Sequence, residues 1–166
     1  MRTLFFSLAL LCSVATLSAQ SQSIINFYER YLHHEKATQI DIDGWLLKLA
    51  GSFAEGEEAK LIEKISHLRV LVMEEENIVD PKDYQRLLRG IQNDNFEQLM
   101  QIRDGGSKID CYVRESGDRI TDLILTVNGE DEFVLLSLEG AFSLDDLRSL
   151  NLEVEGAEHL KKVPRA

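Results

Sequence analysis

Four apolar runs of similar length, separated by glycines, occupy the C-terminal half of this sequence. Glycines at positions 105, 106, 117, 129 and 140 recur every 11 or 12 residues. Runs rich in Leu, Ile, Val, Phe and Tyr between such glycines are typical of short antiparallel strands joined by tight turns. The pattern therefore predicts a four-stranded antiparallel meander, whose strands we place at residues 97–103, 108–115, 120–127 and 132–139.

The predicted strands differ in the pattern of their two faces. In the second strand Ile109, Cys111 and Val113 alternate with polar or amphipathic residues, so one face is buried and the other is wet or half-covered. The third and fourth strands are apolar on both sides and need cover on both sides. We expect helices to supply one layer, and N-terminal strands, a second subunit or a bound ligand to supply the other. The candidate interaction face is the one carrying Tyr112, Ile124, Phe133 and Leu135.

The N-terminal half is patterned as helices and short strands. Helical spacing of apolar residues predicts helices at 23–33 and 59–65, and a capping Asp80 followed by Pro81 predicts a third helix running to Ile91. Residues 38–42 and 68–73 are predicted strands, and residues 45–49 form an apolar turn. A capping box at Ser143–Asp146 predicts a last short helix.

These elements predict an α+β fold. We expect a mainly antiparallel sheet of five or six strands that contains the C-terminal meander, with helices packed mainly on one face. The order of the two short N-terminal strands in the sheet stays open.

The first 19 residues have the features of a secretory signal peptide. Arg2 precedes a short apolar run, and Ala19 stands at the cleavage position before Gln20. Residues 20–166 are then one domain of ordinary size. Cys12 lies in the apolar run behind Leu11 rather than behind a small residue, so we expect no lipid anchor. Cys111 is the remaining thiol, and we expect it to be a buried structural residue.

The net charge of the chain limits the classes of partner that it can bind. Lys and Arg number 18 against 29 Asp and Glu, which gives a formal charge of -11. Such an excess of acid repels phosphate backbones and anionic lipid headgroups, so we expect no nucleic-acid partner and no stable membrane anchor after cleavage.

No residue pattern indicates catalysis, a cofactor or a metal site. The adjacent His33 and His34 point about 100° apart on a helix and cannot chelate one ion together. Residues 39–50 superficially resemble a calcium loop, but Gln39 and Ala50 stand where that loop needs acids. The acidic residues 74–76 are expected to be solvated, with a recognition face for a basic partner as the alternative.

Several segments together resemble one family of small exported proteins. They are Tyr84–Leu88, Phe96–Met100, Asp104–Lys108, Asp131–Gly140 and Leu144–Leu147. In this ordered set the chain resembles the bacterial domain-of-unknown-function family 4252. The resemblance implies a bacterium of the Bacteroidota type and export to the periplasm or beyond. It supplies no activity, cofactor or catalytic residue.

We therefore expect an exported, non-enzymatic binding or interaction protein of the cell envelope. Its partner would be an envelope protein or an apolar ligand, with a homodimer through the sheet as a further possibility. The alternative is a periplasmic carrier or chaperone for a hydrophobic ligand such as a lipid, which needs a closed apolar pocket. A hydrolase is the third hypothesis, and it requires carboxylates that converge in a cleft.

Overall fold

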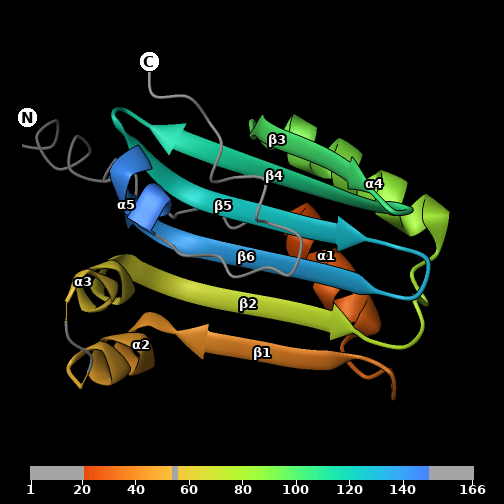
Figure 1. Ribbon diagram of the computed structural model, residues 1–166, viewed down its shortest axis with the longest axis horizontal. Helices are drawn as coiled ribbons and strands as arrows, with labels where there is room; N and C mark the ends of the chain where they lie inside the picture. The colour runs from red at the N-terminus through yellow and green to blue at the C-terminus, as the bar shows by residue number, and fades with distance from the viewer. Residues whose placement is uncertain (1–20, 54–55, 150–166) are drawn as a thin grey trace, which may run out of the picture.

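The computed structural model describes residues 21–53 and 56–149. These residues form an α+β fold around one antiparallel sheet with the strand order β1-β2-β6-β5-β4-β3 (Figure 1). The strands are β1 (Thr38–Asp43), β2 (Ile65–Met73), β3 (Glu97–Asp104), β4 (Ser107–Ser116), β5 (Arg119–Asn128) and β6 (Phe133–Phe142). The helices are α1 (Gln22–Tyr31), α2 (Gly44–Gly51), α3 (Glu57–Lys64), α4 (Pro81–Asn93) and α5 (Leu144–Ser149). The predicted signal peptide lies outside the described residues.

The predicted meander is confirmed as strands β3 to β6. Gly105, Gly106 and Gly117 have φ angles of 55°, 97° and 67°, a backbone conformation that favours glycine in tight turns. Gly140 is different, because it lies inside β6 and not at a turn. A Cβ atom there would lie 2.3 Å from the carbonyl oxygen of Lys64, so this glycine permits a close approach to the end of α3.

The N-terminal half places its strands beyond β6. β2 pairs with β6 on one side and with β1 on the other, in both cases antiparallel. The predicted apolar turn at residues 45–49 is wrong, since these residues belong to α2. At the β1 edge of the sheet, the Tyr28 hydroxyl of α1 donates a hydrogen bond to the main-chain carbonyl of Ile40, at 3.2 Å.

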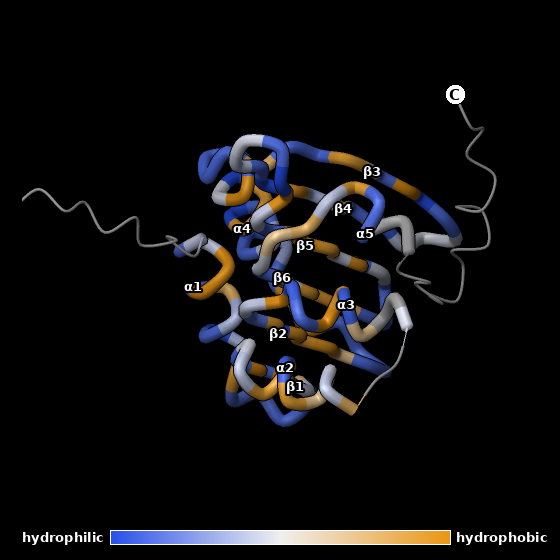
Figure 2. The backbone as a smooth tube through the Cα atoms, turned by 90° about the vertical axis from the view of Figure 1, so that its left-hand side faces the viewer, coloured by the Kyte–Doolittle hydropathy of each residue, from blue (hydrophilic) through white to orange (hydrophobic). Residues whose placement is uncertain are grey.

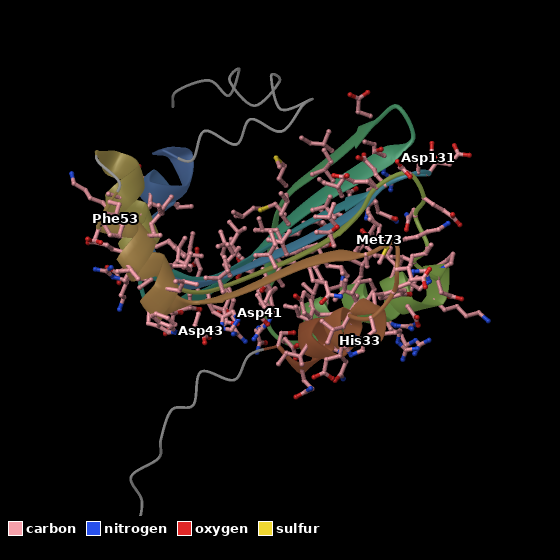
Figure 3. The ribbon with its side chains drawn as sticks, turned by 90° about the horizontal axis from the view of Figure 1, so that it is seen from below. His33, Asp41, Asp43, Phe53, Met73 and Asp131 are labelled. Carbon is pink, nitrogen blue, oxygen red and sulfur yellow. The ribbon has the colours of Figure 1, made fainter. Side chains whose placement is uncertain are left out.

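The two longest helices cover one face of the sheet, which we call the α1/α4 face. In Figure 1 these helices lie behind the sheet, and Figure 3 shows them together beneath one end of it. Phe27 of α1 and Tyr84 of α4 meet Phe133 of β6, with ring centroids 5.4 and 6.0 Å apart. Aromatic residues therefore fill the centre of this core.

The other helices gather at one end of the opposite face (Figures 1 and 3). Leu61 of α3 and Phe142 of β6 are buried there against β4 and β5. The capping box is confirmed: the Asp146 amide donates to the Ser143 hydroxyl, and the Asp146 carboxylate accepts from the Ser143 amide. Hydrogen bonds from Lys64, at 2.6 Å, and from Ser143 lower the pKa of Asp146 to about 2.

Candidate functional site

The face predicted for interaction is occupied by the chain itself. Tyr112, Ile124, Phe133 and Leu135 have exposed fractions of 4, 0, 0 and 2%. They form one core cluster with residues of α1 and α4, such as Phe27. The placement of the interaction surface on these four residues is therefore wrong, because two helices of the same chain bury it.

The opposite face of the sheet, which we call the apolar face, carries three rows of side chains that cross the strands. Every side chain of these rows is apolar except Thr38 and Glu97, which lie on the two edge strands. Row one is Ile102, Ile109, Val127, Val134, Val72 and Thr38; row two is Met100, Cys111, Leu125, Leu136, Val70 and Ile40; row three is Glu97, Val113, Leu123, Leu138, Leu68 and Ile42. The hydropathy colouring in Figure 2 shows hydrophobic segments along these strands.

Strand alternation produces this face directly. Residues two apart on a strand point to the same side, and the cross-strand register aligns the apolar residues of neighbouring strands. Leu123, Leu125 and Val127 on β5 thus stand opposite Leu138, Leu136 and Val134 on β6. A shift by one residue would place buried polar residues on this face.

The apolar face is only partly covered by the described part of the chain. Row three lies at the end where α2 and α3 pack, and Leu68 and Leu138 belong to the cluster with Leu61. In rows one and two, residues such as Val70, Val72 and Leu136 are half-buried, and Ile40 is 43% exposed. Leaving so much contiguous apolar surface in water is unusual for a monomer.

Helix α2 adds exposed apolar side chains at the same end of the sheet. Trp45 is 68% exposed, Leu49 is 50% exposed, and Phe53, just beyond the helix, is 82% exposed. Only Leu47 of this segment packs against the core cluster beneath it. Helix α2 therefore exposes large apolar side chains where an ordinary surface helix exposes polar ones.

Cys111 stands in row two of the apolar face. Its neighbours across the strands are Met100 on β3 and Leu125 on β5. Burial raises the pKa of the thiol to about 11. A thiol of this kind is a poor nucleophile at neutral pH, which fits a packing role and not a reactive one.

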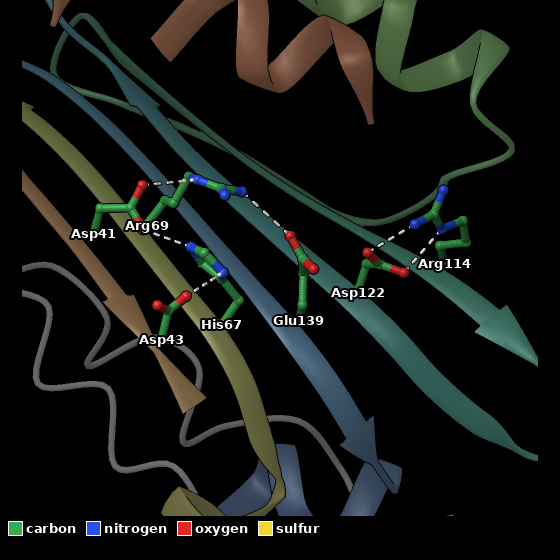
Figure 4. A network of polar contacts seen from close by, with 7 residues as sticks. All are labelled: Asp41, Asp43, His67, Arg69, Arg114, Asp122 and Glu139. Atoms are coloured by element: carbon green, nitrogen blue, oxygen red, sulfur yellow. Dashed lines mark hydrogen bonds and ion pairs between the residues drawn. The ribbon is translucent and has the colours of Figure 1, made fainter. Parts of the chain in front are cut away.

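On the α1/α4 face, beyond the two helices, a charged row crosses the sheet (Figure 4). It runs through Arg114, Asp122, Glu139, His67 and Asp43, which stand opposite one another on successive strands. Both guanidinium contacts of Arg114 with Asp122 are 2.8 Å long. This fork geometry is the strong form of an ion pair.

Further contacts join the β1 end of the charged row. Arg69 lies between Asp41 and Glu139, with nitrogen–oxygen distances of 3.2 and 3.3 Å. His67 contacts Asp41 at 2.5 Å and Asp43 at 3.5 Å. Each carboxylate in this set has a basic side chain beside it. The contacts link β4 to β5, and they link β1, β2 and β6 to one another.

A hollow of about 310 Å³ lies over this charged row, lined by residues that include Ser66, Thr121 and Glu115. Two of its three carboxylates, Asp122 and Glu139, are paired with Arg114 and Arg69. Among the described residues no group of three or more His, Cys, Asp or Glu side chains is arranged to hold a metal ion. The ion pairs of Asp122 and Glu139 are contacts between strands, as in a structural network.

A buried carboxylate was missed by the sequence reasoning. Asp110 is fully buried and accepts hydrogen bonds from Gln98 at 2.9 Å, Gln101 at 2.7 Å and Tyr84 at 3.2 Å. Lys108 pairs with it at 2.7 Å. Because Asp110 precedes Cys111 on the strand, the sequence predicted that it lies on the face opposite to Cys111. The sequence did not show that α4 would bury that face.

Other hollows of the described residues are partly open and have mixed polar and apolar linings. One of about 330 Å³, between α1 and β1, is lined by Glu29, Asp41 and Arg69 among others. Another, of about 450 Å³, surrounds the β3–β4 turn at Gly105. In the part of the chain that the structure describes, no helix is long and apolar enough to cross a membrane.

Comparison with known families agrees with this fold. A family model described as "Domain of unknown function (DUF4252)" matches residues 28–150, from α1 to the end of α5. The chain belongs to the DUF4252 family. No curated protein and no solved structure matches this DUF4252 chain. The matched region holds the whole sheet, including the apolar face and the charged row.

Proposed function

We propose that this DUF4252 protein is an exported, non-enzymatic interaction protein of the bacterial cell envelope, and that it binds through the apolar face. The observation that carries the proposal is the set of three cross-strand rows, in which Glu97 at the β3 edge is the single charged side chain. Exposed apolar surface of this extent is characteristic of a binding surface. The features of a signal peptide at residues 1–19 support the exported location.

The charged row supports the same assignment from the other side of the sheet. Its acids and bases are paired with one another, so the chemistry it offers is cross-linking of strands. Rigid strands present the apolar face as a fixed surface, and a pre-organised surface loses less conformational entropy on binding.

A carrier for a lipid or another hydrophobic ligand is the second candidate. It would need an enclosed apolar pocket. The hollow between α1 and β1 has the volume for a small ligand, but it is partly open, and the charged Glu29, Asp41 and Arg69 line it beside Ile25, Tyr28 and Leu32. The apolar face is therefore the better supported binding surface.

The test is capture of binding partners from envelope extract with immobilised protein comprising residues 20–166. Proteins and lipids in the bound fraction are identified by mass spectrometry. Leu136→Glu places a charge in the middle of the apolar face, and Gln85→Glu places the same charge on the exposed side of α4. We expect Leu136→Glu to lose the bound species and Gln85→Glu to keep them.

Two results would contradict the proposal. Equal capture by both variants would mean that the apolar face does not bind. Turnover of a substrate by the protein, abolished by a substitution in the charged row such as Asp122→Asn, would make the protein an enzyme.

A further inference from the structure

The apolar face has the composition of a permanent interface. Interfaces between copies of one chain are more apolar than transient interfaces, which carry polar and charged residues among their apolar ones. All side chains of rows one and two are apolar except Thr38, and no charge interrupts them. A transient partner would find no charge in these two rows to set its orientation.

The area of the face matches what a stable pair needs. Six strands about 4.8 Å apart span roughly 29 Å, and three rows along the strands add roughly 20 Å, or about 600 Å² of sheet plane. Helices α2 and α3 cover part of row three, where Val113, Leu123 and Leu138 are buried, so this area is an upper limit. Two copies would bury up to about 1,200 Å², at the lower limit of stable interfaces.

The shape of the face also suits a second copy. Two sheets pack face to face about 10 Å apart with their strands rotated by about 30°, and side chains from the two faces interdigitate. A two-fold axis through the middle of row two would bring Leu125 and Leu136 of both copies together. Such an arrangement closes on itself as a dimer.

We propose that the occupant of the apolar face is a second copy of this chain, so that the protein is a homodimer formed by sheet-on-sheet packing. This inference rests on the proposed function, because it names the partner of the same face. The strong acidity of the chain does not oppose it, since Glu97 at the β3 edge of row three is the only acidic side chain in the three rows.

The experiment measures the mass of residues 20–166 in solution by sedimentation equilibrium between about 1 and 100 µM. We expect a dimer. Leu136→Glu would bury two unpaired charges at the centre of the pair and weaken association by at least about a hundredfold. Ile40→Glu, at an exposed position of row two, tests the same face with little risk to folding, and Gln85→Glu should remain dimeric.

Alkylation of Cys111 by a neutral maleimide adds a second measurement on the same samples. Cys111 lies in row two, four strands away from Ile40, so Ile40→Glu leaves its surroundings intact. We expect the thiol to react at least about tenfold more slowly in the dimer than in the monomeric Ile40→Glu variant. Circular dichroism confirms that each variant is folded.

The outcomes separate this inference from the proposed function. A monomer whose Cys111 reacts as fast as in Ile40→Glu would overturn the dimer and leave the face free for a different partner. A monomer with a protected thiol would mean that the chain covers its own face, which overturns both proposals. A dimer that survives both apolar-face substitutions would place the interface elsewhere.

Discussion

At the scale of single residues, the buried carboxylate of Asp110 is important for stability because four side chains contact it. One oxygen accepts from Gln98 and Gln101, and the other accepts from Tyr84 and faces Lys108. Four donors therefore converge on two acceptors. A buried charge is tolerated when it is paired and hydrogen-bonded in this way.

Asp110→Asn should destabilise the fold even though it preserves the shape of the side chain. The side-chain NH2 group of the new asparagine would face hydrogen-bond donors, because all four partners of Asp110 donate. Lys108 would also lose its counter-charge. We expect the free energy of unfolding to fall by about 2–3 kcal/mol, measured by urea denaturation. Asp118→Asn, in the exposed β4–β5 turn, is the control and should change it by less than about 0.5 kcal/mol. Equal effects of the two substitutions would refute the role of Asp110.

At the scale of elements, the packing of α1 on α4 depends on a missing side chain. A Cβ atom on Gly90 of α4 would lie 2.0 Å from the Ser23 hydroxyl oxygen and 2.3 Å from its Cβ. The two helices approach closely at this point, and they form the layer over the α1/α4 face. Glycine inside a helix costs about 1 kcal/mol relative to alanine, so its presence here has a packing reason.

Gly90→Ala should therefore lower the midpoint of thermal unfolding, although alanine is the better helix former. Ser23→Gly removes both atoms that the new methyl group would meet. We expect the double variant to be more stable than the sum of the two single effects predicts, with a coupling of about 1 kcal/mol. Additive effects in this cycle would show that the helices do not meet at these residues.

Most helices and strands were predicted from the sequence, but which face of each strand the helices cover was predicted only in part. Helical spacing placed α1 and α4, and the glycine spacing placed the meander. Trp45–Leu49 was taken for a turn because a short apolar run has no clear period. The Gly140 signal was also misleading, since a glycine required by close packing cannot be distinguished from a turn glycine in sequence.

The error at the candidate site has a physical cause. Alternation divides each strand into two sets of residues, but it does not say which set receives the helices. Helices α1 and α4 pack on the set that contains the aromatic Tyr112 and Phe133, although Asp122 and Glu139 lie on the same face. The other set, which includes Leu123 and contains only aliphatic residues on β5 and β6, was the better predictor of the apolar face. The pairing of β2 with β6 depends on contacts distant in sequence and was not predictable.

At the scale of the whole molecule, acids with a raised pKa shape the response to alkali: Tyr84, Tyr112 and the half-buried Cys111, which have the largest shifts, and also Tyr28 and Tyr31. Burial raises the pKa of Tyr84 and of Tyr112 to about 12, and that of Cys111 to about 11. Their ordinary values are 10.0 for tyrosine and 9.0 for cysteine. In the unfolded chain these groups lose their protons first, so ionisation favours unfolding.

The free energy of unfolding should therefore be unaffected by these groups below about pH 9 and should fall as the pH rises from about 9 to about 12. Urea denaturation at pH 8, 9.5 and 11 measures the loss. Tyr84→Phe removes one of these groups and should make the alkaline decline shallower, even though the variant starts from a lower stability. A decline as steep as that of the unmodified chain would mean that Tyr84 ionises equally in both states.

The hydrogen bond from Tyr28 to the carbonyl of Ile40 limits how this protein can polymerise. An edge strand with free main-chain groups is a template on which another chain can add a strand, and such growth has no end. Tyr28 occupies an acceptor in the middle of β1, so α1 obstructs strand addition at that edge. Growth of a fibre by strand addition at this edge would require that the hydrogen bond from Tyr28 break first.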